Sequence, residues 1–170
     1  MRQRLLAAGY PAEDLQILAP PEAPKDGALV AVLRGSDRSL KPILLLAHID
    51  VVEAKREDWV RDPFRLVEED GWFYARGASD DKSMAAIFTD SLVRYRQDGY
   101  SPRRDIKLAL TCGEETAGAG LFDSVRWLVQ TQPEVLAAEF VINEGAGGEY
   151  DEDGRPIVLQ VQAGEKVYQD

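Results

Sequence analysis

Pro42-Ile-Leu-Leu-Leu-Ala-His48-Ile-Asp50-Val-Val52 is the stretch of the chain on which the fold depends. Its apolar residues run without the alternation of a half-exposed strand, which indicates a central strand covered on both faces. The run ends at His48, the single histidine of the chain, and Asp50 follows on the same face of a strand. A carboxylate there can accept the second ring N–H of a metal-binding histidine and orient the ring. A histidine that merely caps a buried strand is the alternative interpretation.

Strand and helix patterns alternate on both sides of this stretch. Apolar runs predict strands at residues 28–34, 71–75, 105–112, 138–143 and 156–162. Helical periodicity predicts helices at residues 2–8, 82–96 and about 121–130. Gly118 and Gly120 indicate a turn before the last of these helices. This alternation predicts an α/β fold in which helices cover both faces of a largely parallel mixed sheet. Residues 53–70 are expected to form a long, partly ordered loop, and such loops are usually functional.

Length and composition narrow the class of protein. With 170 residues the chain is long enough for one domain with a core. Thirty acidic and twenty basic residues give a formal charge of −10, which argues against nucleic acid and anionic membrane surfaces as partners. The single cysteine, Cys112, excludes an internal disulfide. No stretch approaches the roughly 20 apolar residues of a membrane-spanning helix. The cellular location stays open between the cytoplasm and, behind a removed signal peptide, the periplasm or the exterior.

Acidic residues follow several of the expected strands and turns. The candidate ligands are His48 with Asp50, Asp80 with Asp81, Glu114 with Glu115, and Glu144. In open α/β sheets, sites form at the carboxyl ends of the strands, so these side chains are expected to meet. Clustered carboxylates need a compensating cation. Lys82 and Arg76 could supply part of that charge, and a pair of divalent metal ions would supply more, with mixed histidine and carboxylate ligands suiting Zn²⁺.

Each acidic pair also has a plainer explanation when it is taken alone. Asp80 and Asp81 could cap the helix that follows them. Glu114 and Glu115 could be a solvated pair at a helix start, and Glu144 could belong to an ordinary turn. Taken together, the residues predict a carboxylate-rich metal site, and their spacing by itself predicts no more than that.

Five motifs in order resemble one known family. They are Leu45-Leu-Ala-His48-Ile-Asp50-Val-Val52, Trp59 with Asp62-Pro-Phe64, Tyr74-Ala-Arg-Gly-Ala-Ser-Asp80-Asp-Lys82, Thr111-Cys-Gly-Glu114-Glu115 and Ile142-Asn-Glu144-Gly145. They resemble the zinc-dependent exopeptidase and deacylase family that includes aminoacylase, carboxypeptidase G, carboxypeptidase S, acetylornithine deacetylase and succinyl-diaminopimelate desuccinylase. The resemblance covers nearly the whole chain from about Val30 onward.

The resemblance implies a role for each candidate residue. It implies that His48, Asp80 and Glu144 bind one zinc ion, that Asp80 bridges to a second zinc ion held by Glu115, that Asp50 orients the His48 ring, and that Glu114 is the general base. It also implies a cis peptide bond between Asp80 and Asp81. A complete active site of this family would hold two Zn²⁺ ions, with Co²⁺ or Mn²⁺ as alternatives.

The histidine count implies that part of the family's site is missing. The family has a second metal-binding histidine late in the catalytic domain and a further histidine in an inserted lid. Since this chain has one histidine, residues 1–170 are expected to be the amino-terminal part of a single zinc-peptidase catalytic domain. The lid or dimerisation domain and the carboxyl-terminal catalytic segment would then be absent. One metal site would be nearly complete, this segment alone would have little activity, and the parent protein would dimerise through its lid.

The resemblance implies hydrolysis of an amide bond by zinc-activated water, with Glu114 as the base. Carboxypeptidase-like cleavage of a peptide is the first expectation, and a dipeptidase or an N-acyl-amino-acid deacylase are the alternatives within the enzymes. Outside the enzymes, the chain could be a catalytically silent binding or assembly domain that keeps the fold. It could also be a metal-independent α/β binding domain whose acidic residues are coincidental. No nucleic acid or membrane partner is expected.

Overall fold

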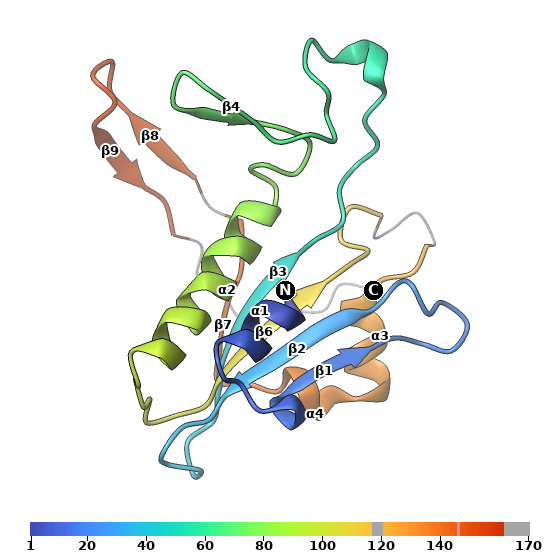
Figure 1. The fold of residues 1–170 in the computed structure, drawn as a ribbon, viewed down its shortest axis with the longest axis vertical. Helices are drawn as coiled ribbons and strands as arrows, with labels where there is room; N and C mark the ends of the chain where they lie inside the picture. Colours follow the sequence, from blue (N-terminus) through green and yellow to red (C-terminus); the bar gives the residue numbers. More distant parts are fainter. Residues whose placement is uncertain (117–120, 146, 162–170) are drawn as a thin grey trace.

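A five-stranded mixed sheet is the centre of the molecule (Figure 1). The computed structural model describes residues 1–116, 121–145 and 147–161. In spatial order the strands are β1 (Leu15–Leu18), β2 (Ala28–Leu33), β6 (Ile106–Thr111), β3 (Ile43–His48) and β7 (Phe140–Ile142). β3 pairs in parallel with both β6 and β7, while β2 is antiparallel to β1 and β6. Four strands therefore run in one direction and only β2 opposes them, which confirms the mostly parallel mixed sheet.

Helices cover both faces of the sheet. On one face α1 (Arg2–Ala7) and α2 (Lys82–Gln97) contribute Leu5, Ala85 and Leu92 to the larger apolar cluster. On the other face α3 (Ser124–Thr131) and α4 (Pro133–Leu136) place Val125 and Val135 against a smaller cluster. The two pairs of helices lie on opposite sides of the strands in Figure 1. The layered α/β fold expected from the sequence is confirmed.

The apolar residues of β3 contribute to both apolar clusters, one on each face of the sheet. Leu45 and Ala47 belong to the cluster under α1 and α2, whereas Leu44 and Leu46 belong to the cluster under α3 and α4. Successive side chains of a strand point to opposite faces, so a strand covered on both sides needs apolar residues at every position. This period places His48 on the same face as Leu44 and Leu46, at the carboxyl end of the strand.

Two hairpins lie outside the sheet, near the amino-terminal end of α2 in Figure 1. One pairs β4 (Val67–Glu69) with β5 (Trp72–Tyr74), and the other pairs β8 (Gly148–Tyr150) with β9 (Pro156–Leu159). The stretch 53–70, expected as a loop, contains β4 and the short 3₁₀ helix η2 (Arg56–Asp58). None of the described helices is both long enough and apolar enough to cross a membrane.

Several element boundaries differ from the sequence expectation. The prediction missed β1, the 3₁₀ helix η1 (Ala12–Asp14), β8 and α4, all of which are only three or four residues long. α3 begins at Ser124 rather than near residue 121, because the Asp123 carboxylate accepts the N–H groups of Val125 and Arg126 and caps the helix there. The last predicted strand ends at Leu159. Gln162, Gly118 and Gly120 lie outside the described residues.

Candidate metal centre

His48 is the centre of the acidic cluster. Its side chain is 3% exposed, and its Nε2 atom lies 2.8 Å from Asp80 Oδ1 and 3.4 Å from Glu144 Oε1. The other ring nitrogen, Nδ1, lies 3.2 Å from the carbonyl oxygen of Asp50 and 3.4 Å from its carboxylate Oδ1. Asp50 therefore contacts the ring as expected, with its backbone carbonyl as the nearer acceptor. The opposite nitrogen faces two carboxylates at once.

The Asp80–Asp81 peptide bond is cis, as expected, and the two side chains have different surroundings. The Asp80 side chain is 64% exposed and reaches His48 Nε2. Asp81 is only 2% exposed, and its Oδ2 accepts the backbone N–H of His48 at 3.3 Å. Asp81 is the N-cap residue of α2, but its side chain makes no cap hydrogen bond, so its carboxylate does not cap the helix as expected. Instead, Asp81 joins the beginning of α2 to the end of β3.

The Asp50 carboxylate links β3 to the turn after β6. Its Oδ2 accepts the backbone N–H of Glu115 at 3.1 Å. Its Oδ1 is buried and has no hydrogen-bond partner in the described part of the chain. A buried carboxylate oxygen without a donor is costly, so this atom leaves an acceptor available for the His48 ring or another cationic group.

Close packing holds the turn that carries Glu114 and Glu115. Gly113 has φ of +92°, and a Cβ atom there would collide with the carbonyl group of Phe122. Next to it, the Ser124 hydroxyl accepts the N–H of Cys112 and donates to its carbonyl, both at 2.8 Å. The strand end, the turn and the start of α3 therefore hold one another in place. Glu114 is exposed above them and Glu115 is partly buried.

The charges of the cluster shift the pKa values of its members. Burial alone would lower the pKa of His48, but Glu144, the hydrogen bond with Asp80 and the charge of Asp50 outweigh it and raise that pKa. Burial is the main cause that raises the pKa of Glu144 and of Glu114, and neighbouring carboxylates add to both shifts. Burial and the surrounding acids together make these carboxylates hold their protons more tightly, and a cation would stabilise their ionised forms.

The predicted compensating cations do not neutralise this cluster. Neither Lys82 nor Arg76 forms an ion pair with an acid among the described residues. The Arg76 guanidinium lies over the ring of Trp59, 5.2 Å from its centroid. Among the described residues, the His48 ring is therefore the one basic group within ion-pair distance of these carboxylates.

The residues present fit a metal ion. Two groups of three offer ligand atoms that lie within 4.8 Å of one another, namely His48 with Asp81 and Glu144, and His48 with Asp80 and Glu115. Asp80 is the better ligand of the two aspartates, because its carboxylate is accessible and reaches Nε2, whereas Asp81 is buried and occupied by the His48 N–H. Carboxylate oxygens around one imidazole are a donor set that suits zinc.

The structure brings together the six residues to which the family resemblance assigns a role, and it adds others. Sequence reasoning offered Asp81 only as a helix cap or a partner of Asp80 and missed its hydrogen bond to the His48 backbone, and it assigned no role to Gly113 or Ser124. Thr111, Asp123 and Asn143 line the same cavity of about 240 Å³ as His48, Glu114 and Glu144. Their proximity depends on the pairing of β3, β6 and β7, which local sequence does not reveal.

The sequence of this chain is similar to those of several known proteins. A sequence profile of Peptidase family M20/M25/M40 matches residues 44–158. The N-fatty-acyl-amino acid synthase/hydrolase of Mus musculus is 38% identical over 114 residues, which are 67% of this chain and 22% of the relative. Aminoacylase-1 of Homo sapiens is 33% identical over 130 residues, which are 74% of this chain and 31% of the relative.

Solved structures show the same fold. A metallo-carboxypeptidase of family M20 from Sulfolobus solfataricus superimposes with a TM-score of 0.67 and 25% identity, over 91% of this chain and 32% of that one. Human carnosine dipeptidase 1 superimposes with a TM-score of 0.63 and 24% identity, over 84% and 31% of the two chains. In each case the chain spans less than a third of the length of the relative whose structure it resembles.

Proposed function

Because this chain belongs to Peptidase family M20/M25/M40, we propose that it carries part of the active site of a metal-dependent hydrolase that cleaves amide bonds. The supporting observation is the convergence on His48 of carboxylates from separate segments, Asp80 before α2 and Glu144 after β7. Residues 1–170 would form the amino-terminal part of the catalytic domain, and the remainder of the site would come from sequence outside this segment.

The proposed ligands of the first zinc ion are His48, Asp80 and Glu144, and Glu115 would bind a second ion that Asp80 bridges. When bound, zinc supplies a Lewis acid and lowers the pKa of a coordinated water toward about 7. Asp50 would keep the His48 ring in place through its contacts with Nδ1. Asp81 would hold the backbone at His48, so that the ligand pair His48 and Asp80 keeps its spacing.

Glu114 is the proposed general base. Its exposed carboxylate would take a proton from the attacking water and return it to the nitrogen of the leaving amine. Burial and the neighbouring acids raise the pKa of Glu114, which makes it a better proton acceptor near neutral pH than an unperturbed glutamate. A base must release the proton again, so Glu114 would not be a tight metal ligand.

The proposed substrate is an amide between an acyl group and an amino acid with a free carboxylate. The relatives are named for two forms of this bond, since one set acts on N-acyl amino acids and another is a carboxypeptidase. Carboxypeptidase-like cleavage of a peptide and deacylation of an N-acyl amino acid both release such an amino acid. Co²⁺ or Mn²⁺ could replace zinc, because both accept imidazole and carboxylate ligands.

A pair of matched substitutions tests the proposed ligand and base roles. Glu144→Gln and Glu114→Gln each remove one charge from the cluster without changing side-chain size. Since Glu144 is a proposed ligand and Glu114 is not, Glu144→Gln should weaken zinc binding about 10- to 100-fold, and Glu114→Gln should leave it within about threefold. Isothermal titration of the 170-residue chain with ZnCl₂ measures both, with His48→Ala as the variant expected to lose binding.

Zinc binding that is unchanged in His48→Ala would contradict the proposal. Equal losses in the two glutamine variants would show that charge alone attracts the ion, and the assignment of Glu114 as a base would then be wrong. The unmodified chain is expected to bind one zinc ion tightly, because it contains all three proposed ligands of the first site, namely His48, Asp80 and Glu144.

A further inference from the structure

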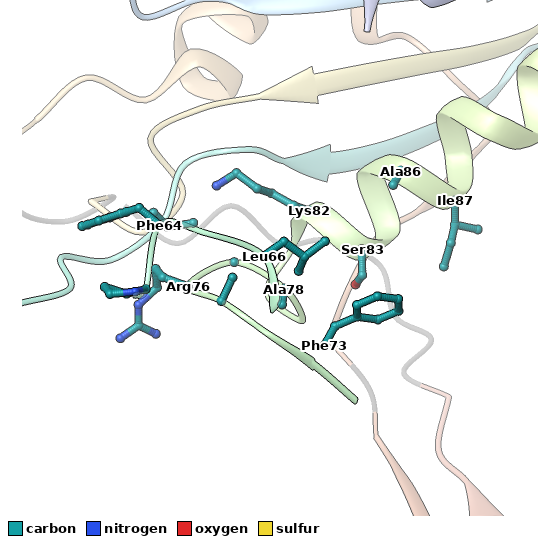
Figure 2. A pocket seen from close by; sticks show the side chains of 13 residues that line it. Phe64, Leu66, Phe73, Arg76, Ala78, Lys82, Ser83, Ala86 and Ile87 are labelled. Carbon is teal, nitrogen blue, oxygen red and sulfur yellow. The ribbon is translucent and has the colours of Figure 1, made fainter. Parts of the chain in front are cut away.

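An apolar cavity of about 700 Å³ lies beside the acidic cluster and has no role in the site described above. Its walls come from the segment after β3, the hairpin β4–β5 and the start of α2. Figure 2 shows Phe73 of the hairpin across from Ser83 and Ile87 of α2, with Phe64 and Leu66 from the preceding segment. Cavities of this size are typical of small-molecule sites, whose lining is mostly apolar with a few polar groups.

The apolar walls of this cavity are open to solvent. Phe64, Leu66, Phe73 and Ile87 are each between 60% and 73% exposed. Exposed apolar side chains gathered on one cavity usually mark a place where another molecule binds. Three separate segments supply them, so the cavity is a consequence of tertiary structure.

The charge of the lining is opposite to that of the protein. The chain as a whole carries a formal charge of −10, yet the residues around this cavity include two cations, Arg76 and Lys82, and no acid. Gly77 leaves room for the Lys82 ammonium group, which lies 3.0 Å from where a Cβ of residue 77 would be. The Nε atom of Arg76 is buried and has no hydrogen-bond partner in the described part of the chain. The complementary occupant has an apolar body and an anionic group.

The cavity adjoins the proposed metal site and shares a lining residue with it. Ser83 lines it and also lines a neighbouring cavity of about 600 Å³, where Asp80 and Glu144 lie. Lys82 and Ser83 follow directly after the Asp80–Asp81 pair. One extended molecule could therefore occupy both cavities, with its polar end among the acids and cations and its apolar end between α2 and the hairpin.

We infer that this cavity binds the long aliphatic chain of an anionic amphiphile, and that it receives the acyl chain of the amide substrate. The second part rests on the proposed function, whereas the first part concerns binding alone. The acyl chain would lie between Phe73 and Ile87, and Lys82 would attract the carboxylate of the substrate or of the released acid. Long-chain acyl groups would then bind better than short ones.

Binding of simple fatty acids to the 170-residue chain tests this inference without any metal or catalysis. Octanoate, decanoate and dodecanoate are titrated below their micelle concentrations, with 1-decanol as an uncharged probe. Each added methylene should tighten binding about fourfold, because burying one contributes roughly 0.8 kcal/mol. Lys82→Met keeps the apolar stem and should weaken decanoate about two- to fivefold while leaving 1-decanol unchanged.

Ala86→Phe fills the cavity from α2, where Ala86 is exposed and lies in the lining. It should weaken dodecanoate at least about tenfold, since the ring takes the place of several methylenes. Gln97→Phe is the matched control, because it adds the same ring at the other end of the helix. Phe73→Asp acts on the opposite wall and serves as a second test if Ala86→Phe does not fold.

Affinities that do not rise with chain length, or that stay the same in Ala86→Phe and Phe73→Asp, would overturn the inference. The inference would also be overturned if the chain self-associates, Ala86→Phe abolishes that association, and decanoate does not dissociate the oligomer. The occupant of the cavity would then be a second copy of the chain. Zinc binding by the His48 and Glu144 variants tests the proposed function, and fatty-acid binding tests the cavity, so the two proposals can fail separately. Fatty acids that bind as expected to a chain that binds no zinc would establish an apolar ligand site and refute its role in catalysis.

Discussion

At the scale of single residues, the candidate site depends on groups that are neither proposed metal ligands nor the proposed base. Asp81 accepts the N–H of His48, and Asp50 accepts the N–H of Glu115, so one buried and one partly buried carboxylate orient the backbone that carries two proposed ligands. Gly113 permits the tight turn beside them. These residues fix the backbone positions from which the proposed ligands His48 and Glu115 reach the site.

Gly113→Ala should destabilise the chain and displace Glu114 and Glu115. The positive φ costs about 1–2 kcal/mol for a residue with a Cβ, and the collision with Phe122 adds to it. Gly99 also has a positive φ, of +67°, but no atom lies within 4 Å of its Cβ position. Urea unfolding should therefore show a larger loss for Gly113→Ala than for Gly99→Ala. Equal losses would mean that the turn after β6 moves aside without cost.

At the scale of elements, one lysine joins the sheet to the short helix before β7. Lys107 of β6 donates from Nζ to the carbonyl oxygens of Glu134, Val135 and Ala137, at 2.8, 3.1 and 2.9 Å. These carbonyls lie at the end of α4, where helix groups have no partner within the helix. Burial lowers the pKa of Lys107, and the charges of Asp105 and Glu134 oppose that shift.

Lys107→Met should lower the free energy of unfolding by about 1.5–3 kcal/mol, the usual range for a hydrogen bond to a charged group. The exposed Lys41 provides the control, and Lys41→Met should change stability by less than about 0.5 kcal/mol. Hydrogen exchange should locate the loss in α4 and β7. A variant as stable as the unmodified chain would show that water replaces the ammonium group at these carbonyls.

At the scale of the whole molecule, β7 lies at the edge of the described sheet with its side chains uncovered. Phe140, Val141 and Ile142 are 57%, 47% and 50% exposed. An apolar edge strand with free backbone groups is a template for pairing with another chain. We therefore expect the 170-residue chain to self-associate through this edge as its concentration rises.

Val141→Lys should shift the chain toward the monomer, because a charged side chain on an edge strand opposes pairing. Sedimentation velocity over a range of concentrations measures the change. Ile17→Lys on β1, at the opposite edge, is the matched control, since Ile17 is 67% exposed. The same association in both variants would place the contact elsewhere on the surface.

Much of this architecture could be predicted from local pattern. The unbroken apolar run of β3 indicates a strand buried on both faces, and the period of residues 82–96 indicates the helix that covers it. Elements of three or four residues, such as β1 and α4, carry too little periodicity to be recognised, and their place depends on contacts with distant residues. The composition of residues 53–70 likewise did not reveal the hairpin strand β4, which is only three residues long.

From the sequence by itself, the class of fold and the family could be predicted, and a set of candidate site residues could be proposed, because apolar strands and motif residues occupy short, ordered stretches of the chain. Only the tertiary structure decided which aspartate faces His48 and which supports its backbone, since Asp80 and Asp81 are chemically identical neighbours. It also decided that an apolar, cationic cavity adjoins the acids. That arrangement depends on how three separate segments pack, and no local pattern encodes their meeting.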